Sequence, residues 1–176
     1  MKQVRIAVDV DGCLADFAQA VLNRAKQLGM EKDFPKSCSE IACWDIAPRF
    51  SELMKDVWED EKFWLNIPPL VKELPFTPNC YITQRHVPSE VTAKWLAKHK
   101  FPKADVITVS CPTEKLQHVK DRNIDLYVDD LYKTVKQMRD AGIQAILMYQ
   151  PYQRGHAEEC KDLPTIKKWD EVFKYI

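Results

Sequence analysis

Residues 4–10 constrain the fold of this chain most, because they predict a buried strand that ends in acidic groups. Their apolar residues run almost without a break, which is typical of a strand with both faces covered. Asp9 and Asp11 stand two residues apart at its end, and Gly12 follows. Strands of this type build parallel sheets, and open α/β sheets bind ligands at the carboxyl edge of their strands. The segment therefore predicts an α/β fold with two carboxylates at the ligand-binding edge.

The spacing of these two aspartates also predicts a metal ion. Two carboxylates held this close repel each other unless a cation or a shared proton compensates. Asp9 and Asp11 are therefore expected beside a divalent cation. Mg²⁺ is the ion favoured here, because it prefers few carboxylates and completes its coordination with water and substrate phosphate oxygens.

Strand-like and helix-like stretches alternate along most of the remaining chain. This alternation predicts a Rossmann-like parallel sheet with helices on both faces and right-handed crossovers. The tail from Tyr149 is expected to be loop-like up to a terminal helix. The further strands are expected at residues 80–83, 105–109, 126–128 and 143–148, and the helices at 16–28, 51–60, 88–99, 131–141 and 169–176. A helical turn or short helix is expected at 112–119.

Residues 30–70 differ in character from the rest of the chain. Four prolines interrupt them, and aromatic residues are crowded together there. We interpret this stretch as a small helical cap, too short to be an independent domain, with Ser51 as the cap of its main helix. Residues 1–29 and 71–176 then form the core.

A second acidic pair, Asp129 and Asp130, follows the strand expected at residues 126–128. In a parallel sheet the carboxyl ends of all strands lie at one edge, so this pair can meet Asp9 and Asp11 there. Asp129 and Asp130 could also cap the helix that follows them. The convergence of two acidic pairs is the strongest structural argument in the sequence, and it requires no likeness to any known protein.

Composition argues against several classes of function. The 26 basic and 26 acidic residues cancel, and no basic tract stands out, so binding to long nucleic acid is not expected. No apolar run is long enough to span a membrane, and the N-terminus lacks the layout of a signal peptide. The six cysteines contain no C-x-x-C pair, which favours reduced thiols and a cytoplasmic protein. Whether the chain forms a homodimer is left open.

Residues 9–16, with the sequence D-V-D-G-C-L-A-D, resemble the first motif (D-x-D-G-x-L-A-D) of the haloacid dehalogenase (HAD) superfamily of phosphatases. Thr83, Lys115 and the pair Asp129–Asp130 match the other three motifs in order. The resemblance covers nearly the whole chain. It implies a Rossmann-like core with a small helical cap inserted after the first motif, in agreement with the interpretation of residues 30–70.

The chemistry available to these residues is phosphoryl transfer. Asp9 is the candidate nucleophile, since a carboxylate can attack phosphorus and form an acyl phosphate. Asp11 is the candidate general acid and base. The Thr83 hydroxyl, the backbone N–H of Gln84 and the Lys115 ammonium are expected to hold phosphate oxygens. The expected ligands of Mg²⁺ are the Asp9 carboxylate, the Asp11 backbone carbonyl, Asp129, and Asp130 either directly or through water.

Within the superfamily, the chain is most similar to the 5'(3')-deoxyribonucleotidase branch. Phe17 follows the extended first motif as in that branch, and residues 61–70 resemble its aromatic run leading to a proline. The resemblance implies that cap aromatics stack on a nucleobase. The candidates are Phe17, Trp44, Phe63 and Trp64. The sequence departs from the branch at Gln84, where the branch tends to have serine, and at Cys43, which replaces an aromatic residue.

The sequence thus predicts a Mg²⁺-dependent phosphomonoesterase whose substrate is a nucleoside monophosphate. A first alternative keeps the chemistry and changes the substrate to polynucleotide ends or other small phosphate esters. A second alternative is a non-catalytic ligand-binding protein with the same fold, since fold alone does not establish function. Arg85 and His86 either bind substrate or lie in a surface loop, and Asp16 is expected to be a helix cap.

Overall fold

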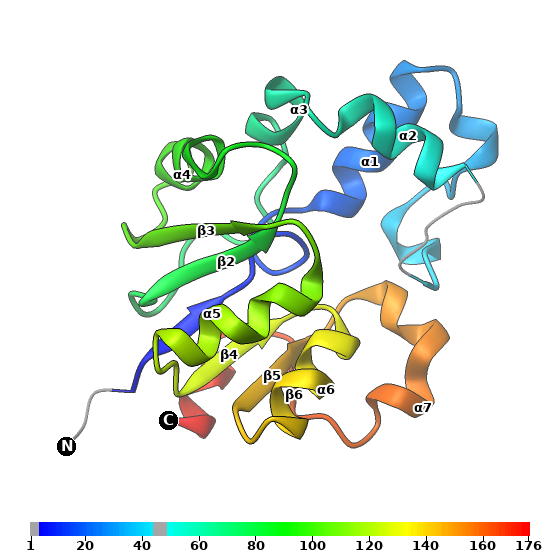
Figure 1. Cartoon of the computed structure of the whole chain (residues 1–176). Coiled ribbons are helices and arrows are strands. Elements are labelled where there is room, and N and C mark those ends of the chain that lie inside the picture. Colours follow the sequence, from blue (N-terminus) through cyan, green and yellow to red (C-terminus); the bar gives the residue numbers. More distant parts are fainter. Residues whose placement is uncertain (1–3, 44–48) are drawn as a thin grey trace.

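The computed structural model describes residues 4–43 and 49–176 (Figure 1). Six parallel strands in this part of the chain form one sheet, in the order β3-β2-β1-β4-β5-β6. This confirms the predicted parallel α/β fold and places β1 between β2 and β4. The strands are β1 (Ile6–Val8), β2 (Cys80–Gln84), β3 (Asp105–Val109), β4 (Leu126–Asp129), β5 (Gln144–Met148) and β6 (Thr165–Ile166).

Helices cover both faces of the sheet, as predicted (Figure 1). Successive side chains of β4 point to opposite faces of the sheet, and both faces are buried. Val128 packs in one buried cluster with Trp95, and Tyr127 packs in the other with Val135. The first cluster belongs to α4 and the C-terminal 3₁₀ helix, and the second to α5 and α6. Their bounds are α4 (Ser89–Lys98), α5 (Lys115–Asp121), α6 (Tyr132–Asp140) and the 3₁₀ helix Trp169–Tyr175.

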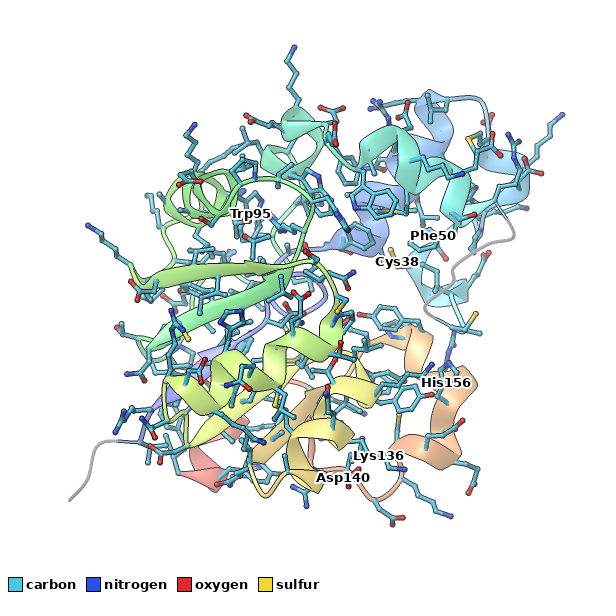
Figure 2. The ribbon with its side chains drawn as sticks, viewed as in Figure 1. Cys38, Phe50, Trp95, Lys136, Asp140 and His156 are labelled. Carbon is cyan, nitrogen blue, oxygen red and sulfur yellow. The ribbon has the colours of Figure 1, made fainter. Side chains whose placement is uncertain are left out.

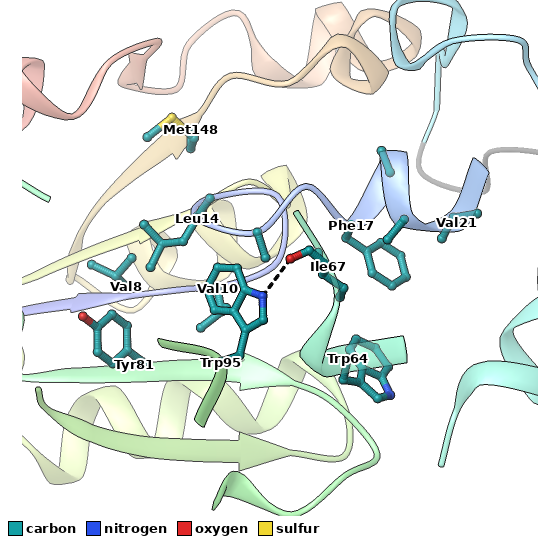
Figure 3. Close-up of a cluster of buried hydrophobic side chains, with 14 of the residues drawn as sticks. Val8, Val10, Leu14, Phe17, Val21, Trp64, Ile67, Tyr81, Trp95 and Met148 are labelled. Atoms are coloured by element: carbon teal, nitrogen blue, oxygen red, sulfur yellow. Dashed lines mark hydrogen bonds between the residues drawn. The ribbon is translucent and has the colours of Figure 1, made fainter. Parts of the chain in front are cut away.

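Trp95 anchors α4 to the chain that returns from the cap. Its side chain is fully buried, and its ring stacks on Phe101 at a centroid distance of 5.6 Å. A buried indole N–H needs an acceptor, and Trp95 Nε1 donates to the carbonyl oxygen of Ile67 at 2.8 Å (Figure 3). This contact fixes the position at which the chain re-enters the core.

Three helices gather beyond the carboxyl edge of the sheet (Figure 1). They are α1 (Phe17–Gln27), α2 (Phe50–Val57) and α3 (Glu61–Leu65). Asp16 accepts a hydrogen bond from Gln19 N at 3.0 Å, which confirms it as the cap of α1. Arg24 of α1 pairs with Asp56 of α2 at 2.6 Å, so α1 packs against the cap helix α2. The division of core from cap at residue 30 stays a prediction.

The two chain segments that join the sheet to these helices run side by side. Asp16 N donates to Pro68 O, and Leu70 N donates to Leu14 O, each at 2.7 Å. Both segments lie next to the loop that carries Asp11. The base of the cap is therefore tied directly to the predicted catalytic loop.

The expectation of a loop-like tail from Tyr149 was wrong. The tail contains the 3₁₀ helix Pro151–His156, the short helix α7 (Ala157–Cys160) and the edge strand β6. The strand has only two residues, too few to give an alternating pattern, and its pairing with β5 defines it: Tyr149 N donates to Ile166 O at 2.8 Å. The terminal stretch is helical, as predicted, but in the 3₁₀ form.

One other local expectation needs correction. Ser51 does not cap α2, because that helix begins at Phe50 and no side chain caps its first turn. The helical turn or short helix expected at 112–119 is confirmed: it is a 3₁₀ turn, Pro112–Glu114, followed by α5. Proline suits the first position of this helical segment, because the N–H that it lacks would have no partner within the helix there. In the part of the chain that the structure describes, no helix is long and apolar enough to cross a membrane.

Candidate active site

The carboxyl edge of the sheet brings the predicted catalytic, phosphate-binding and metal-binding residues into one cavity of about 410 Å³. β1 and β4 are neighbours, and Asp9 N donates to Val128 O at 2.9 Å, which sets Asp9 beside the acidic end of β4. Thr83 arrives from β2 and Lys115 from the start of α5. The predicted residues that line the cavity are Asp9, Asp11, Thr83, Gln84, Lys115, Asp129 and Asp130.

All the buried charged side chains of the described residues lie at this edge. Four are carboxylates and two are cations. In their fully ionised state they leave two uncompensated negative charges, which is the charge that one divalent cation would balance. The buried charged residues are Asp9, Asp11, Arg85, Lys115, Asp129 and Asp130.

Lys115 bridges two of the carboxylates. Its Nζ lies 2.8 Å from Asp129 Oδ2 and 3.1 Å from Asp9 Oδ1. Burial alone would lower the pKa of Lys115, but the adjacent Asp129 and Asp9 outweigh burial and raise that pKa above its ordinary value. Lys115 is therefore a fixed positive charge within reach of any phosphate beside Asp9.

The surroundings of Asp9 shift the pKa of its carboxyl group strongly. Burial raises its pKa to about 7; Lys115 opposes this effect, while Asp129 and Asp11 reinforce it. Its Oδ1 is buried and accepts no hydrogen bond from the described residues, although the Lys115 ammonium lies nearby. Because Asp9 shares the Lys115 ammonium with Asp129 and accepts no hydrogen bond, this oxygen fits a position beside a further cation such as a metal ion.

Asp130 is the carboxylate that faces Asp9. One oxygen or sulfur atom from each of Asp9, Cys13 and Asp130 lies within 4.8 Å of the others. Burial and the nearby Asp130 raise the pKa of the Cys13 thiol well above its ordinary value, so it stays protonated. The donors left for a cation are carboxylate oxygens, which suits a hard ion such as Mg²⁺. Tyr152 OH donates to Asp130 Oδ2 and orients it.

Asp129 differs from Asp130 because its two oxygens already have partners within the protein. Oδ2 accepts from Lys115 Nζ at 2.8 Å and from Tyr127 OH at 2.9 Å, and Oδ1 accepts from Leu131 N at 2.8 Å. On this geometry Asp129 orients Lys115, and Asp130 is the better oriented of the pair toward a cation beside Asp9. The sequence could have indicated Tyr127, since residues two apart on a strand share a face.

Asp11 has a partner that the sequence did not identify. Arg85 donates from Nη2 to Asp11 Oδ1 at 2.7 Å and from Nε to Asp11 Oδ2 at 2.8 Å. Thr83 Oγ1 adds a longer contact to Asp11 Oδ2 at 3.3 Å. Arg85 is buried, so it does not belong to a surface loop. The available signal was again strand alternation, because Arg85 follows Thr83 by two residues, just beyond the end of β2.

A second cavity, of about 450 Å³, lies between the cap helices and the sheet edge. It shares Asp11 and Gln84 with the first cavity, so these residues stand at the boundary between the two. Figure 2 shows Phe50, which lines the cap cavity, and His156, which lines the first cavity, on opposite sides of this edge. The other residues of the cap cavity are Phe17, Ser51, Met54, Lys55, Trp58, Trp64 and His86.

The structure distributes the predicted base-contacting aromatics unevenly. Phe17 and Trp64 line the cap cavity, but they stack on each other at 5.8 Å, and Trp64 is only 2% exposed. Phe63 lies outside it, in a groove on the other side of α3. Trp44 lies outside the described residues. Trp58, which the sequence did not indicate as a ligand contact, also lines the cap cavity and is 37% exposed.

Trp58 forms one wall of the cap cavity together with His86. The two rings meet edge to face at a centroid distance of 4.2 Å. His86 was expected either in the site or in a surface loop, and it is an exposed residue that lines the cavity. Both rings can therefore contact a ligand without any change in the buried core.

Comparison with known proteins supports the fold. No protein-family model and no curated protein sequence matches the chain. Among solved structures, a HAD-like hydrolase from Streptococcus pneumoniae is similar, with a TM-score of 0.63, 15% identity, and coverage of 98% of this chain and 97% of that one. A protein described as a HAD hydrolase, from Bacillus subtilis and bound to magnesium, gives a TM-score of 0.57 with 15% identity and 99% coverage of both chains.

A predicted phosphoglycolate phosphatase from Haemophilus somnus is similar to the same degree, with a TM-score of 0.54, 13% identity and 99% coverage of both chains. At these identities the likeness concerns the fold. The chain therefore has the Rossmann-like HAD fold over its whole described length. What it does depends on the site.

Proposed function

We propose that this protein is a Mg²⁺-dependent phosphomonoesterase that hydrolyses nucleoside monophosphates through an aspartyl-phosphate intermediate. One observation carries the proposal: Asp11 stands at the boundary between a charged cavity and an apolar one. A phosphoryl group suits the first cavity and an organic leaving group suits the second. The bond to be broken would then lie beside Asp11, where a proton is needed.

In this mechanism Asp9 attacks phosphorus and the bond to the leaving oxygen breaks. Asp11 enters this step protonated, with the proton on an oxygen lone pair that Arg85 does not use, and gives that proton to the leaving oxygen, so the product leaves as an alcohol. Asp11 then takes a proton from the water that attacks the phosphorus of the acyl phosphate, which releases phosphate and restores Asp9. Splitting one displacement into two in this way needs both carboxyl groups at the same phosphorus, and both line the charged cavity.

Three groups are available to hold the phosphoryl oxygens. Lys115 supplies a fixed charge, and the Thr83 hydroxyl and the Gln84 backbone N–H lie at the end of β2. Fixed donors of this kind stabilise the charge of the transition state without reorganisation, and they usually supply a large share of phosphoryl-transfer catalysis.

Asp9, Asp130 and the backbone carbonyl of Asp11 are the groups that we propose to hold Mg²⁺. The Asp9 oxygen that accepts no hydrogen bond from the described residues and the excess of buried negative charge support this assignment. When bound, the ion neutralises charge on the phosphoryl oxygens and orients them for in-line attack. Asp129 contributes by fixing Lys115.

The cap cavity supports an aromatic leaving group. Its wall carries Trp58 and His86, and flat rings bury apolar area there at little entropic cost. A nucleoside, with a deoxyribose preferred, fits this chemistry. Lys55 also lines the cavity, and it favours a second candidate: a small phosphate ester with an anionic leaving group, such as the phosphoglycolate named for one structural neighbour.

Phosphate release from a panel of substrates tests the proposal. The panel consists of ribo- and deoxyribonucleoside 5'- and 3'-monophosphates, phosphoglycolate, sugar phosphates and a 3'-phosphorylated oligonucleotide, each with Mg²⁺ and with EDTA. We expect Mg²⁺-dependent release that is fastest for deoxynucleotides and that Asp9→Asn abolishes. Release only from phosphoglycolate or the oligonucleotide would keep the mechanism and refute the substrate. No release from any of them would favour a non-catalytic binding role.

A further inference from the structure

Arg85 is a buried cation that the proposed mechanism does not yet use. Its side chain has no exposed surface, and it makes a bidentate ion pair with Asp11. The remaining nitrogen, Nη1, donates to Thr92 Oγ1 at 3.2 Å. Every nitrogen of the guanidinium thus has a partner inside the protein.

The surroundings of Arg85 hold it in place. Its Cζ lies 5.0 Å from the ring centre of Trp64 and 5.9 Å from that of Trp95, one from the cap and one from the core. A guanidinium packed between indole rings gains cation–π attraction and has little freedom to swing out. Arg85 therefore cannot reach a substrate without breaking these contacts, and a direct role in binding phosphate is excluded by the geometry.

Arg85 also provides the main constraint on the Asp11 side chain. The Thr83 contact to Asp11 is long, at 3.3 Å, whereas both Arg85 contacts are short and charge-assisted. The planar fork fixes both carboxylate oxygens at once, which a single-point donor cannot do. Without Arg85, the Asp11 carboxyl group could rotate away from the boundary between the two cavities.

We propose that Arg85 is the positioning residue for Asp11, and that it aims the carboxyl group at the leaving-group oxygen. This inference rests on the proposed function, because Asp11 must first be the proton donor. It assigns Arg85 no contact with substrate or metal. It also gives Trp64 a role other than base stacking, since that ring packs on the positioning residue.

This role predicts a dependence on the leaving group. A benzyl phosphate leaves as an alkoxide that needs a proton in the transition state. A p-nitrophenyl phosphate leaves as a stabilised anion that needs almost none. Misplacing Asp11 should therefore slow the first substrate far more than the second, whereas general structural damage should slow both equally. The ratio of the two kcat/KM values in one preparation is independent of the fraction of protein that is folded.

The test compares the wild type with Arg85→Gln and Arg85→Lys. General acid catalysis contributes about 10²- to 10⁴-fold, so we expect Arg85→Gln to lower the benzyl-to-nitrophenyl ratio by about 10- to 100-fold. Arg85→Lys keeps a charge but loses the fork, and it should recover part of the ratio. If Arg85→Gln does not fold, Arg85→Lys alone tests the inference, and we expect it to lower the benzyl-to-nitrophenyl ratio by an intermediate amount.

Leu96→Ala is the matched control. Leu96 is buried in the same helix as Thr92, α4, and makes no contact with Arg85 among the interactions described above, so its truncation should weaken the fold and leave the ratio unchanged. An unchanged ratio in both Arg85 variants, a rise in the ratio, or an equal fall in Leu96→Ala would overturn the inference. Failure of the proposed function is distinct, because the wild type would then release no phosphate from either substrate.

Discussion

Replacing Gly12 with alanine should separate backbone strain from damage to the site. Gly12 has a φ of +75°, and a Cβ there would overlap the Asp130 carboxylate and the Tyr152 hydroxyl. Gly29 provides the control: its φ is +69°, and a Cβ there meets nothing within 4 Å. Gly12→Ala and Gly29→Ala therefore share the left-handed backbone and differ only in what the new methyl group touches.

The expected magnitudes follow from these contacts. A non-glycine residue in the left-handed region costs about 1–2 kcal/mol, and this applies to both variants. In Gly12→Ala the pair formed by Asp130 and Tyr152 must also separate, and the loss of this buried hydrogen bond to a carboxylate costs about 1–3 kcal/mol. The free energy of unfolding should thus fall by about 2–5 kcal/mol in Gly12→Ala and by about 1–2 kcal/mol in Gly29→Ala.

Urea unfolding at 25 °C measures both values, first in EDTA and then with Mg²⁺. Mg²⁺ at 100 times its Kd should stabilise the wild type and Gly29→Ala by about 2.7 kcal/mol. Gly12→Ala should gain less, because its Asp130 is displaced. Equal destabilisation of the two variants in EDTA would refute the overlap expected at Gly12, and equal stabilisation by Mg²⁺ would refute the assignment of Asp130 to the metal.

Three further perturbations test other parts of the site. In EDTA, the free energy of unfolding should fall as the pH rises from about 4 towards 7, because burial raises the pKa of Asp9 from 3.8 to about 7 and the folded protein then holds a proton that the unfolded chain has lost. Urea titrations of the wild type and of Asp9→Asn across this pH range check the prediction. A pH dependence of Asp9→Asn as steep as that of the wild type would contradict it. Lys115→Met removes the ion-pair partner of Asp9 and Asp129, so the variant should lose turnover and about 3–5 kcal/mol of stability. Phosphate release and urea unfolding measure the two losses. Near-normal values would show that Lys115 is not the cation that holds these two carboxylates together. Trp58→Ala should raise KM for nucleotides with little change for phosphoglycolate, and an unchanged KM for nucleotides would remove the cap cavity as the nucleoside site.

The sequence predicted the parts of the molecule that follow from local pattern. Apolar strands followed by acidic residues at 9 and 129 sufficed to place both pairs at one edge, because the carboxyl ends of parallel strands meet there. The helices with a clear apolar stripe, such as α4, were found for the same reason. These features depend on residues close together in the chain.

Features set by long-range contacts were missed. Strand alternation puts Arg85 on the same face as Thr83, but the burial of Arg85 depends on Asp11, Trp64 and Trp95, which are brought together only by the fold. Trp64 looked available for stacking, but its ring is already covered. The two residues of β6 pair only because the tail returns to the sheet edge.

The central claim, that Asp9 carries the phosphoryl group during turnover, is tested most directly by trapping it. Protein quenched in acid during steady-state hydrolysis with Mg²⁺ should carry a phosphoryl group on the peptide that contains Asp9, as found by mass spectrometry. The Asp9→Asn variant should carry none. Steady turnover with no phosphorylated peptide, or with the phosphoryl group on a different residue, would contradict the proposed mechanism.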